Sequence, residues 1–120
     1  MANFNSVVLV GRLTRDPELR YTPTGDAVCT FGIAINRKWT PAGGEQKEET
    51  VFLDIEAWKR LGETCGTHLK KGREVLVHGS VRQEKWENDR TGKKGTKTRI
   101  AAQAVQFLGP KPDGEPGSEG

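Results

Sequence analysis

Only one stretch of this chain spaces its apolar residues as a helix requires. Within residues 59–71, Leu61, Cys65 and Leu69 recur at intervals of four, which places them on one face of a helix. Elsewhere, β-branched and aromatic residues recur between short clusters of glycine, proline, asparagine and aspartate. That pattern is typical of strands separated by turns. The sequence therefore predicts a mostly β structure with a single helix.

The order of the predicted elements narrows the fold further. Five segments have the composition of strands, and they span about residues 4–13, 27–39, 49–58, 75–86 and 98–108. The helix falls between the third and fourth strands, which gives the order β-β-β-α-β-β. That order is the layout of the OB-fold, a five-stranded, partly open β-barrel. A parallel α/β design would need more helices than this chain offers.

Two glycines lower the stability of the predicted helix. Gly62 and Gly66 lie inside the helix, and each weakens it by about 1 kcal/mol relative to alanine, so tertiary packing must hold it. Gly72 is predicted to cap its C-terminal end.

Residues 1–109 are expected to form one domain. Residues 110–120 contain proline, glycine and acidic residues without an apolar side chain, and we expect a disordered tail there.

Length, cysteine content and charge restrict the class of protein. A chain of 120 residues has room for one small core. No apolar run is long enough to span a membrane and no start resembles a signal peptide, so we expect a cytoplasmic protein without a membrane partner. The net charge is +3, and seven basic residues against three acidic ones gather between residues 82 and 99. Such a stretch favours a polyanionic partner.

The segment 49–58 places different kinds of side chain on its two faces. The predicted core face carries Val51, Leu53, Ile55 and Ala57. The opposite face carries Phe52, Asp54, Glu56 and Trp58. Two large aromatic rings therefore flank two carboxylates on a face that is not core. Either the rings bind a ligand, or they pack under the helix or against another subunit.

Catalytic and metal-binding interpretations find little support in the residues. Asp54 and Glu56 share one strand face and form a pair of carboxylates, but a solvated face or partners for neighbouring lysines explain them more simply. Cys65 and His68 have a zinc-like spacing, yet a structural site needs two further ligands. Cys29 lies in an apolar alternation and is predicted to be a core residue.

Aromatic residues beside basic ones favour nucleic-acid binding instead. Nucleobases stack on exposed rings while lysine and arginine side chains neutralise the phosphates. Trp39 directly follows Arg37 and Lys38, and Trp86 follows Lys85 at the edge of the basic stretch. Trp39 shares the strand parity of core residues, so a core position is its alternative. The predicted stacking residues are Trp39, Phe52, Trp58 and Trp86.

Several separated motifs resemble the bacterial-type single-stranded DNA-binding proteins. They are Val8-Leu9-Val10-Gly11-Arg12-Leu13, Asp16-Pro17-Glu18-Leu19-Arg20-Tyr21, Thr24-Gly25, Leu69-Lys70-Lys71-Gly72, Val77-His78-Gly79-Ser80-Val81 and Lys85-Trp86. The likeness covers about residues 3–109 in the same order. The resemblance implies an OB-fold homotetramer that wraps single-stranded DNA during replication, recombination and repair.

The resemblance also implies particular site residues. The principal stacking positions of that family fall on the same four aromatic residues. Basic positions near the DNA fall on Arg20, Lys47, Arg60, Lys71 and Lys85. Asp54 stands where some members have a basic residue, and an acid there would repel phosphate unless it is paired. Residues 110–120 resemble the family's linker. Replication and repair partners are expected only if an acidic tip of the family's kind, ending in Ile-Pro-Phe, exists in the full-length protein.

These observations predict a non-enzymatic protein that binds single-stranded DNA largely independently of sequence. Stacking and phosphate neutralisation supply the binding, and neither a cofactor nor a metal is needed. A related OB-fold used in replication restart or on RNA is the first alternative. A metal-dependent nuclease that uses Asp54 and Glu56 is the second.

Overall fold

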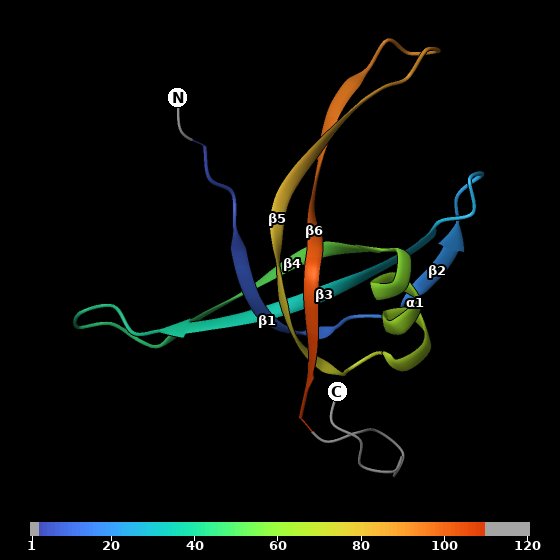
Figure 1. Cartoon of the computed structure of the whole chain (residues 1–120). Helices are drawn as coiled ribbons and strands as arrows, with labels where there is room; N and C mark the ends of the chain where they lie inside the picture. The colour runs from blue at the N-terminus through green and yellow to red at the C-terminus, as the bar shows by residue number, and fades with distance from the viewer. Residues whose placement is uncertain (1–2, 110–120) are drawn as a thin grey trace.

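Five long strands close into a barrel, with one helix across one end, in the computed structural model, which describes residues 3–109 (Figure 1). The elements are β1 (Val7–Leu13), β2 (Glu18–Tyr21), β3 (Ala27–Trp39), β4 (Lys47–Trp58), α1 (Lys59–His68), β5 (Glu74–Glu87) and β6 (Lys94–Leu108). The predicted disordered tail at 110–120 lies outside the described residues.

The pairing of the strands confirms the predicted five-stranded barrel. Neighbouring strands follow the order β1-β5-β6-β4-β3, and β1 pairs with β3 through Arg12 and Leu13 to close the circuit. The β4–β6 pairing is parallel and involves only two residue pairs, Ile55 with Ile100 and Glu56 with Ala101. The barrel is therefore closed by two short pairings, β1–β3 and β4–β6, each of two residue pairs. The OB-fold prediction is confirmed.

The short strand β2 was not predicted, because residues 14–26 had the proline and glycine content of a connection. It pairs antiparallel with the start of β3, outside the barrel circuit. Leu19 on β2 is half-buried and packs against the core. A Cβ atom on Gly66 of α1 would lie 3.0 Å from the Cβ of Leu19. The contact between β2 and α1 thus explains why a four-residue strand persists here.

The core is formed by alternate residues of each strand together with one face of α1. Its buried members are Leu13, Cys29, Phe31, Ile33, Ile55, Ala57, Cys65, Leu69, Val75, Val77 and Ile100. Both cysteines are free thiols. Desolvation raises the pKa of Cys29 to about 11 and that of Cys65 to about 12, the latter with a smaller contribution from Cys29. Cys65 is therefore a core residue, as Cys29 was predicted to be.

The helix α1 packs unusually close to the sheet. A Cβ atom on Gly62 would lie 2.5 Å from the carbonyl oxygen of Ala57 and 3.2 Å from the amide nitrogen of Cys29. Glycine thus weakens the helix as predicted but also permits this approach. The helix ends at His68, earlier than predicted, and the Leu69 amide donates to the Cys65 carbonyl over 3.0 Å. Within residues 3–109, α1 is too short and too polar to cross a membrane.

Gly72 has a different role from the predicted helix cap. Its φ is +90°, a left-handed conformation that favours glycine. Its amide donates to the carbonyl oxygen of Leu13 over 2.8 Å, and the Leu13 amide donates to the carbonyl of Arg73 over 3.0 Å. The turn before β5 is thereby tied to the end of β1.

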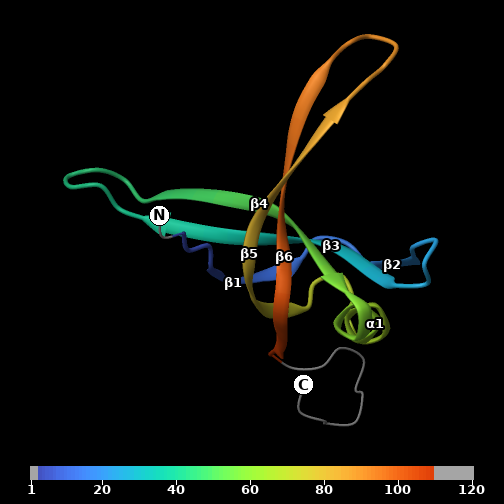
Figure 2. The ribbon, with the colours of Figure 1, turned by 45° about the horizontal axis from the view of Figure 1, so that its top comes forward.

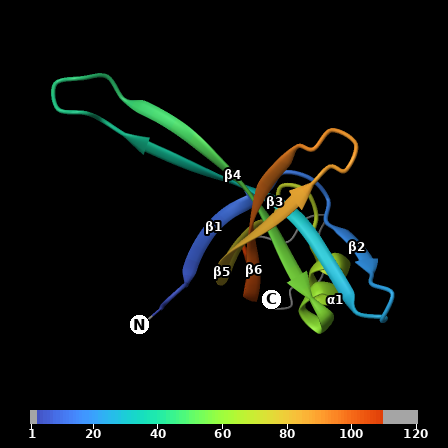
Figure 3. The ribbon, with the colours of Figure 1, turned by 90° about the horizontal axis from the view of Figure 1, so that it is seen from above.

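Two hairpins extend beyond the barrel as two-stranded arms (Figures 1 and 2). The β3–β4 arm comprises residues 36–50, and the β5–β6 arm comprises residues 82–98. Nearly all of their side chains are exposed on both faces. The arms point in different directions, as the view from above shows (Figure 3). They carry part of the candidate site away from the barrel wall.

Candidate nucleic-acid interface

Three large aromatic side chains are exposed on strand faces that point away from the core. Phe52 is 70% exposed, Trp58 39% and Trp86 51%. The outward parity predicted for Phe52 and Trp58 is therefore confirmed. On the opposite face of β4, Ile55 and Ala57 are fully buried, but Val51 is 40% exposed. The core position predicted for Val51 is wrong, because β4 has left the barrel wall at that point.

The orientation of the Trp58 ring is fixed by a hydrogen bond to one member of an ion pair, Glu56–Arg99. Its Nε1 donates a hydrogen bond to Oε1 of Glu56 over 2.8 Å. The other carboxylate oxygen, Oε2, lies 2.7 Å from Nη1 of Arg99. Arg99 also approaches Oε1 of Glu84 at 3.7 Å, so β4, β6 and β5 are linked. Glu56 is only 7% exposed, so the solvated face suggested for it is wrong. It does have a basic partner, but that partner is Arg99 rather than a neighbouring lysine.

Phe52 stands beside a hollow of about 360 Å³ on the outer face of the sheet. The hollow is lined by Thr14, Arg15, Gly32, Ile33, Phe52, Leu53, Asp54 and Thr98. Nη2 of Arg15 lies 3.7 Å from Oδ1 of Asp54. A Cβ atom on Gly32, the β3 partner of Asp54, would lie 2.6 Å from Nη1 of Arg15. Arg15 therefore lies flat across the sheet and offsets the negative charge of Asp54.

Trp39 and Trp86 lie on the two arms. Trp39 is half-buried and does not belong to the core, so the core alternative for it is wrong. The guanidinium carbon of Arg37 lies 4.7 Å from the centroid of its ring. Trp39 has the parity opposite to that of Phe52, so the two rings face opposite sides of the sheet. The Trp86 ring lies over Gly95, its cross-strand partner, and a Cβ atom there would collide with the indole.

Four of the five basic residues implied by the resemblance lie near an aromatic residue, two through strand pairing and two along the sequence. Arg20 pairs with Val28, which pairs in turn with Trp58, so three strands place them in one row. Lys47 is the cross-strand partner of Trp39. Arg60 lies two residues after Trp58, at the start of α1, and Lys85 precedes Trp86.

Lys71 is the exception, because it lies beyond the far end of α1, in the turn before β5. All five basic side chains belong to exposed residues. Across residues 3–109, none of them forms a salt bridge. Their charges are therefore not offset by a carboxylate of the described chain.

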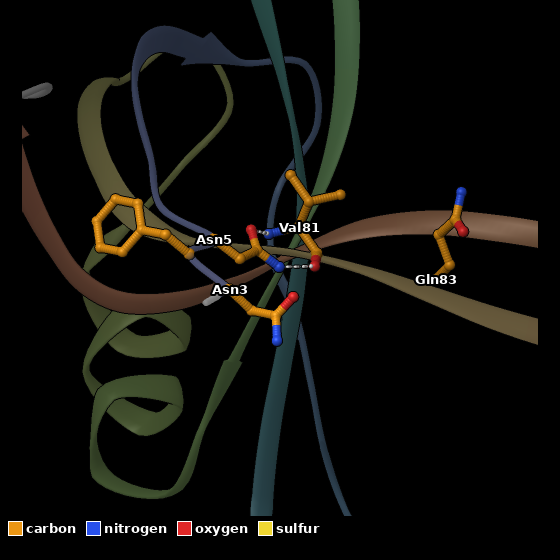
Figure 4. Close-up of a pocket in the computed structure, with 5 residues that line it drawn as sticks. Asn3, Asn5, Val81 and Gln83 are labelled. Carbon is orange, nitrogen blue, oxygen red and sulfur yellow. Dashed lines mark hydrogen bonds between the residues drawn. The ribbon is translucent and has the colours of Figure 1, made fainter. Parts of the chain in front are cut away.

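A second hollow, of about 610 Å³, lies between the N-terminal segment and β5 (Figure 4). Asn3, Phe4, Asn5, Val81 and Gln83 line it. The Asn5 side chain pairs with the backbone of Val81 in both directions, accepting from the amide at 2.9 Å and donating to the carbonyl at 2.7 Å. This pairing fixes the N-terminal segment on β5 and leaves Phe4 93% exposed.

The model of the single-strand binding protein family matches residues 4–108. The chain belongs to this family. Among curated single-strand binding proteins, it is 49% identical over 109 residues to the single-stranded DNA-binding protein of Treponema pallidum (strain Nichols), covering 91% of this chain and 60% of that one. It is 47% identical over 116 residues to single-stranded DNA-binding protein A of Bacillus subtilis (strain 168), covering 97% of this chain and 66% of that one. The chain thus spans about three-fifths to two-thirds of these relatives.

A solved member of the single-strand binding protein family has the same fold. The structure described as Plasmodium falciparum SSB in complex with ssDNA superposes with a TM-score of 0.84 at 27% identity. The match covers 91% of this chain and 98% of that one. It extends the likeness from sequence motifs to the arrangement of the strands.

The sequence analysis missed two residues of the candidate interface in this chain, Arg15 and Arg99. Arg15 precedes the Asp16-Pro17 turn, and nothing in its neighbourhood indicates that it reaches Asp54. Arg99 was counted only as part of a basic stretch, and its partner Glu56 lies 43 residues earlier in the chain. The only available signal was Gly32, a glycine within a strand, which often marks a close approach.

Proposed function

We propose that this chain binds single-stranded DNA, largely independently of sequence, by stacking bases on exposed rings and neutralising phosphates. The observation that carries the proposal is the row formed by Arg20, Val28 and Trp58, which places an exposed cation and an exposed, hydrogen-bonded indole on either side of one buried valine. Phe52 continues the same face of β4. Every nucleobase has an aromatic face, so such a surface tolerates any sequence.

A fluorescence titration with poly(dT) tests the proposal. Stacking on tryptophan should quench the emission, and Trp58→Ala should weaken binding by about 1–3 kcal/mol. Trp58→Phe retains a ring and is the matched control, which should keep most of the affinity. Unchanged affinity of Trp58→Ala with lowered stability would show that Trp58 is a packing residue.

Binding rather than catalysis is supported by the environment of the two carboxylates. Asp54 faces Arg15 and Glu56 faces Arg99, so each acid has a cationic partner within the fold. We therefore propose a non-enzymatic role. Incubation of labelled single strands with Mg²⁺ should leave them intact, whereas cleavage products would favour the nuclease alternative. Competition between DNA and RNA oligonucleotides separates DNA binding from an RNA-binding or restart module, because a protein that recognises the 2′-hydroxyl would favour RNA.

We further propose that the chain assembles into a homotetramer. Val8 is 62% exposed and Val10 44%, on the face of β1 that points away from the core. Exposed apolar side chains of this kind are typical of surfaces that subunit contacts cover. The surface supports self-association, and the number four comes from the family resemblance. A monomeric mass by light scattering at micromolar concentration would contradict the assembly.

The proposed ligand sets the cellular role. A protein of this kind protects single strands in replication, recombination and repair, and would act at the nucleoid. Recruitment of replication and repair proteins is assigned to an acidic tip with an apolar end, if the full-length protein carries one, because an interface without a buried anchor is weak.

A further inference from the structure

Three basic side chains surround a hollow at the foot of the barrel, where β1 ends, β5 begins and β6 ends. Arg12, Lys71 and Arg73 line this hollow of about 280 Å³, together with Glu74 and the chain at Gly72, Leu108 and Gly109. In Figure 1 the start of β5 and the end of β6 lie at the opposite end of these strands from the β5–β6 arm. At about 3.3 Å per strand residue, Trp86 lies about 40 Å further along β5.

Arg73 is the most unusual of the three, because it is only 8% exposed. Its Nε donates to the carbonyl oxygen of Leu108 over 3.0 Å, and its guanidinium carbon lies 5.6 Å from the Phe107 ring centroid. No carboxylate pairs with it within residues 3–109. A buried guanidinium without an anionic partner is costly, so the hollow lacks the negative group that would balance it.

The backbone holds these cations in place without a ligand. The Lys71 amide donates to Oδ1 of Asp16 over 2.8 Å, and the hydrogen bonds between Leu13 and the Gly72–Arg73 segment fix the turn on β1. Arg12 and Glu74 are cross-strand partners, yet no salt bridge joins them. The hollow therefore carries three cations against one carboxylate in a fixed arrangement, which lowers the cost of ordering a ligand.

We propose that this hollow, the foot site, binds a backbone phosphate of single-stranded DNA that has passed the aromatic residues. The inference rests on the proposed function and adds Arg12 and Arg73 to its binding residues. Arginine presents paired N–H groups that match phosphate oxygens. Arg60 is the second residue of α1 and Lys71 lies three residues beyond its end, and the ten-residue helix is about 15 Å long. A strand that leaves Trp58 beside Arg60 thus meets Lys71 and then the foot site.

Oligonucleotides of two lengths test the foot site on the full chain. One has about 8 nucleotides, within the ~4–16 that one OB-fold accommodates, and the other about 35. We compare wild type, Arg12→Gln and Lys38→Gln by fluorescence titration over a salt series. Lys38 is the matched control, because its Nζ already lies 3.5 Å from Oε2 of Glu48. Arg12 is exposed, so its replacement should leave the urea unfolding midpoint unchanged.

The expected result is specific to length. For the longer strand, Arg12→Gln should reduce the slope of log Kobs against log salt by about 0.7, the value for one phosphate contact on single strands. For the shorter strand, the slope should not change. Glu74→Gln removes the only carboxylate of the hollow and should tighten binding of the longer strand alone. Equal slopes for wild type and Arg12→Gln on the longer strand, or the same reduction in Lys38→Gln, would overturn the foot site.

The same titrations separate the two proposals. If wild type binds neither strand, the proposed function itself fails. If wild type binds both strands and quenches normally while Arg12→Gln and Glu74→Gln behave like wild type, only the foot site fails.

Discussion

Trp58 rests on Glu56: the indole Nε1 donates to Oε1 of the carboxylate over 2.8 Å, while Arg99 holds Oε2 at 2.7 Å. An exposed ring is thus oriented by a carboxylate that is almost fully buried. The next residue, Lys59, has a φ of +59°, a left-handed conformation that is uncommon outside glycine. The Trp58 ring therefore lies at the sharp turn from β4 into α1, and its hydrogen bond to Glu56 fixes its orientation there.

Glu56→Gln should destabilise the protein by roughly 1–3 kcal/mol, because a charged hydrogen bond to a mostly buried arginine is lost. Only the contact of Arg99 with Glu84, at 3.7 Å, would then oppose its charge. Urea unfolding measures the change. Glu84→Gln is the control and should cost much less, because that carboxylate is half-exposed. Equal losses in the two variants would contradict the special role of Glu56.

Asp54→Asn should strengthen DNA binding. The substitution removes the carboxylate that lies 3.7 Å from Arg15, which frees the guanidinium for a phosphate beside Phe52. The salt slope should become steeper by about 0.7 if one contact is gained. Arg15→Gln should weaken binding, and in an Arg15→Gln background Asp54→Asn should lose most of its effect. A weaker complex for Asp54→Asn alone would show that the acid serves binding directly.

Gly62→Ala should destabilise the fold by roughly 1–3 kcal/mol, although alanine favours helices by about 1 kcal/mol. The added Cβ would meet backbone atoms of Ala57 and Cys29, which cannot rotate away. Thermal or urea unfolding measures the loss. Thr64→Ala, at an exposed position of the same helix, should be neutral or slightly stabilising. A stabilised Gly62→Ala would mean that α1 can withdraw from the sheet at little cost.

The stability of the protein should fall at alkaline pH because of the two buried thiols. Burial raises the pKa of Cys29 from 9.0 to about 11 and that of Cys65 from 9.0 to about 12. The folded state therefore keeps protons that the unfolded state releases, so this stability is complete below about pH 9 and is lost as the pH rises towards 11–12. Urea unfolding between pH 8 and 10.5 measures the decline, with Cys65→Ala as the comparison, in which the decline should be shallower. At pH 8.5, native thiols should resist alkylation; rapid labelling would show that the core opens readily.

The fold was accessible to sequence reasoning because alternation and one helical repeat dominate the chain. Parity also identified Phe52 and Trp58 as outward-facing. Parity states which face a side chain takes, but it does not state whether anything covers that face, and this is why Val51 was misplaced. Strand β2 has only four residues between proline-containing turns, too short for a pattern to appear.

The ion pairs of the site could not be predicted from the sequence, for a different reason. Glu56 and Arg99 are distant in sequence and adjacent only because β4 and β6 run in parallel there. A glutamate viewed alone is predicted to be solvated, since charged residues are seldom buried unless paired. Arg15 and Asp54 likewise meet only after the barrel has closed. Pairing across the barrel, rather than local propensity, decides these positions.

The two arms divide the site into parts of unequal stiffness. An isolated two-stranded ribbon is marginally stable in water, and the β3–β4 and β5–β6 arms have no core of their own. Trp58, by contrast, is anchored to the barrel through Glu56 and Arg99. A strand of DNA would therefore meet Phe52 and the anchored ring of Trp58 on β4, and two adjustable rings, Trp39 and Trp86, on the arms. Such a surface can accept irregular backbone paths, at the cost of ordering the arms in each complex.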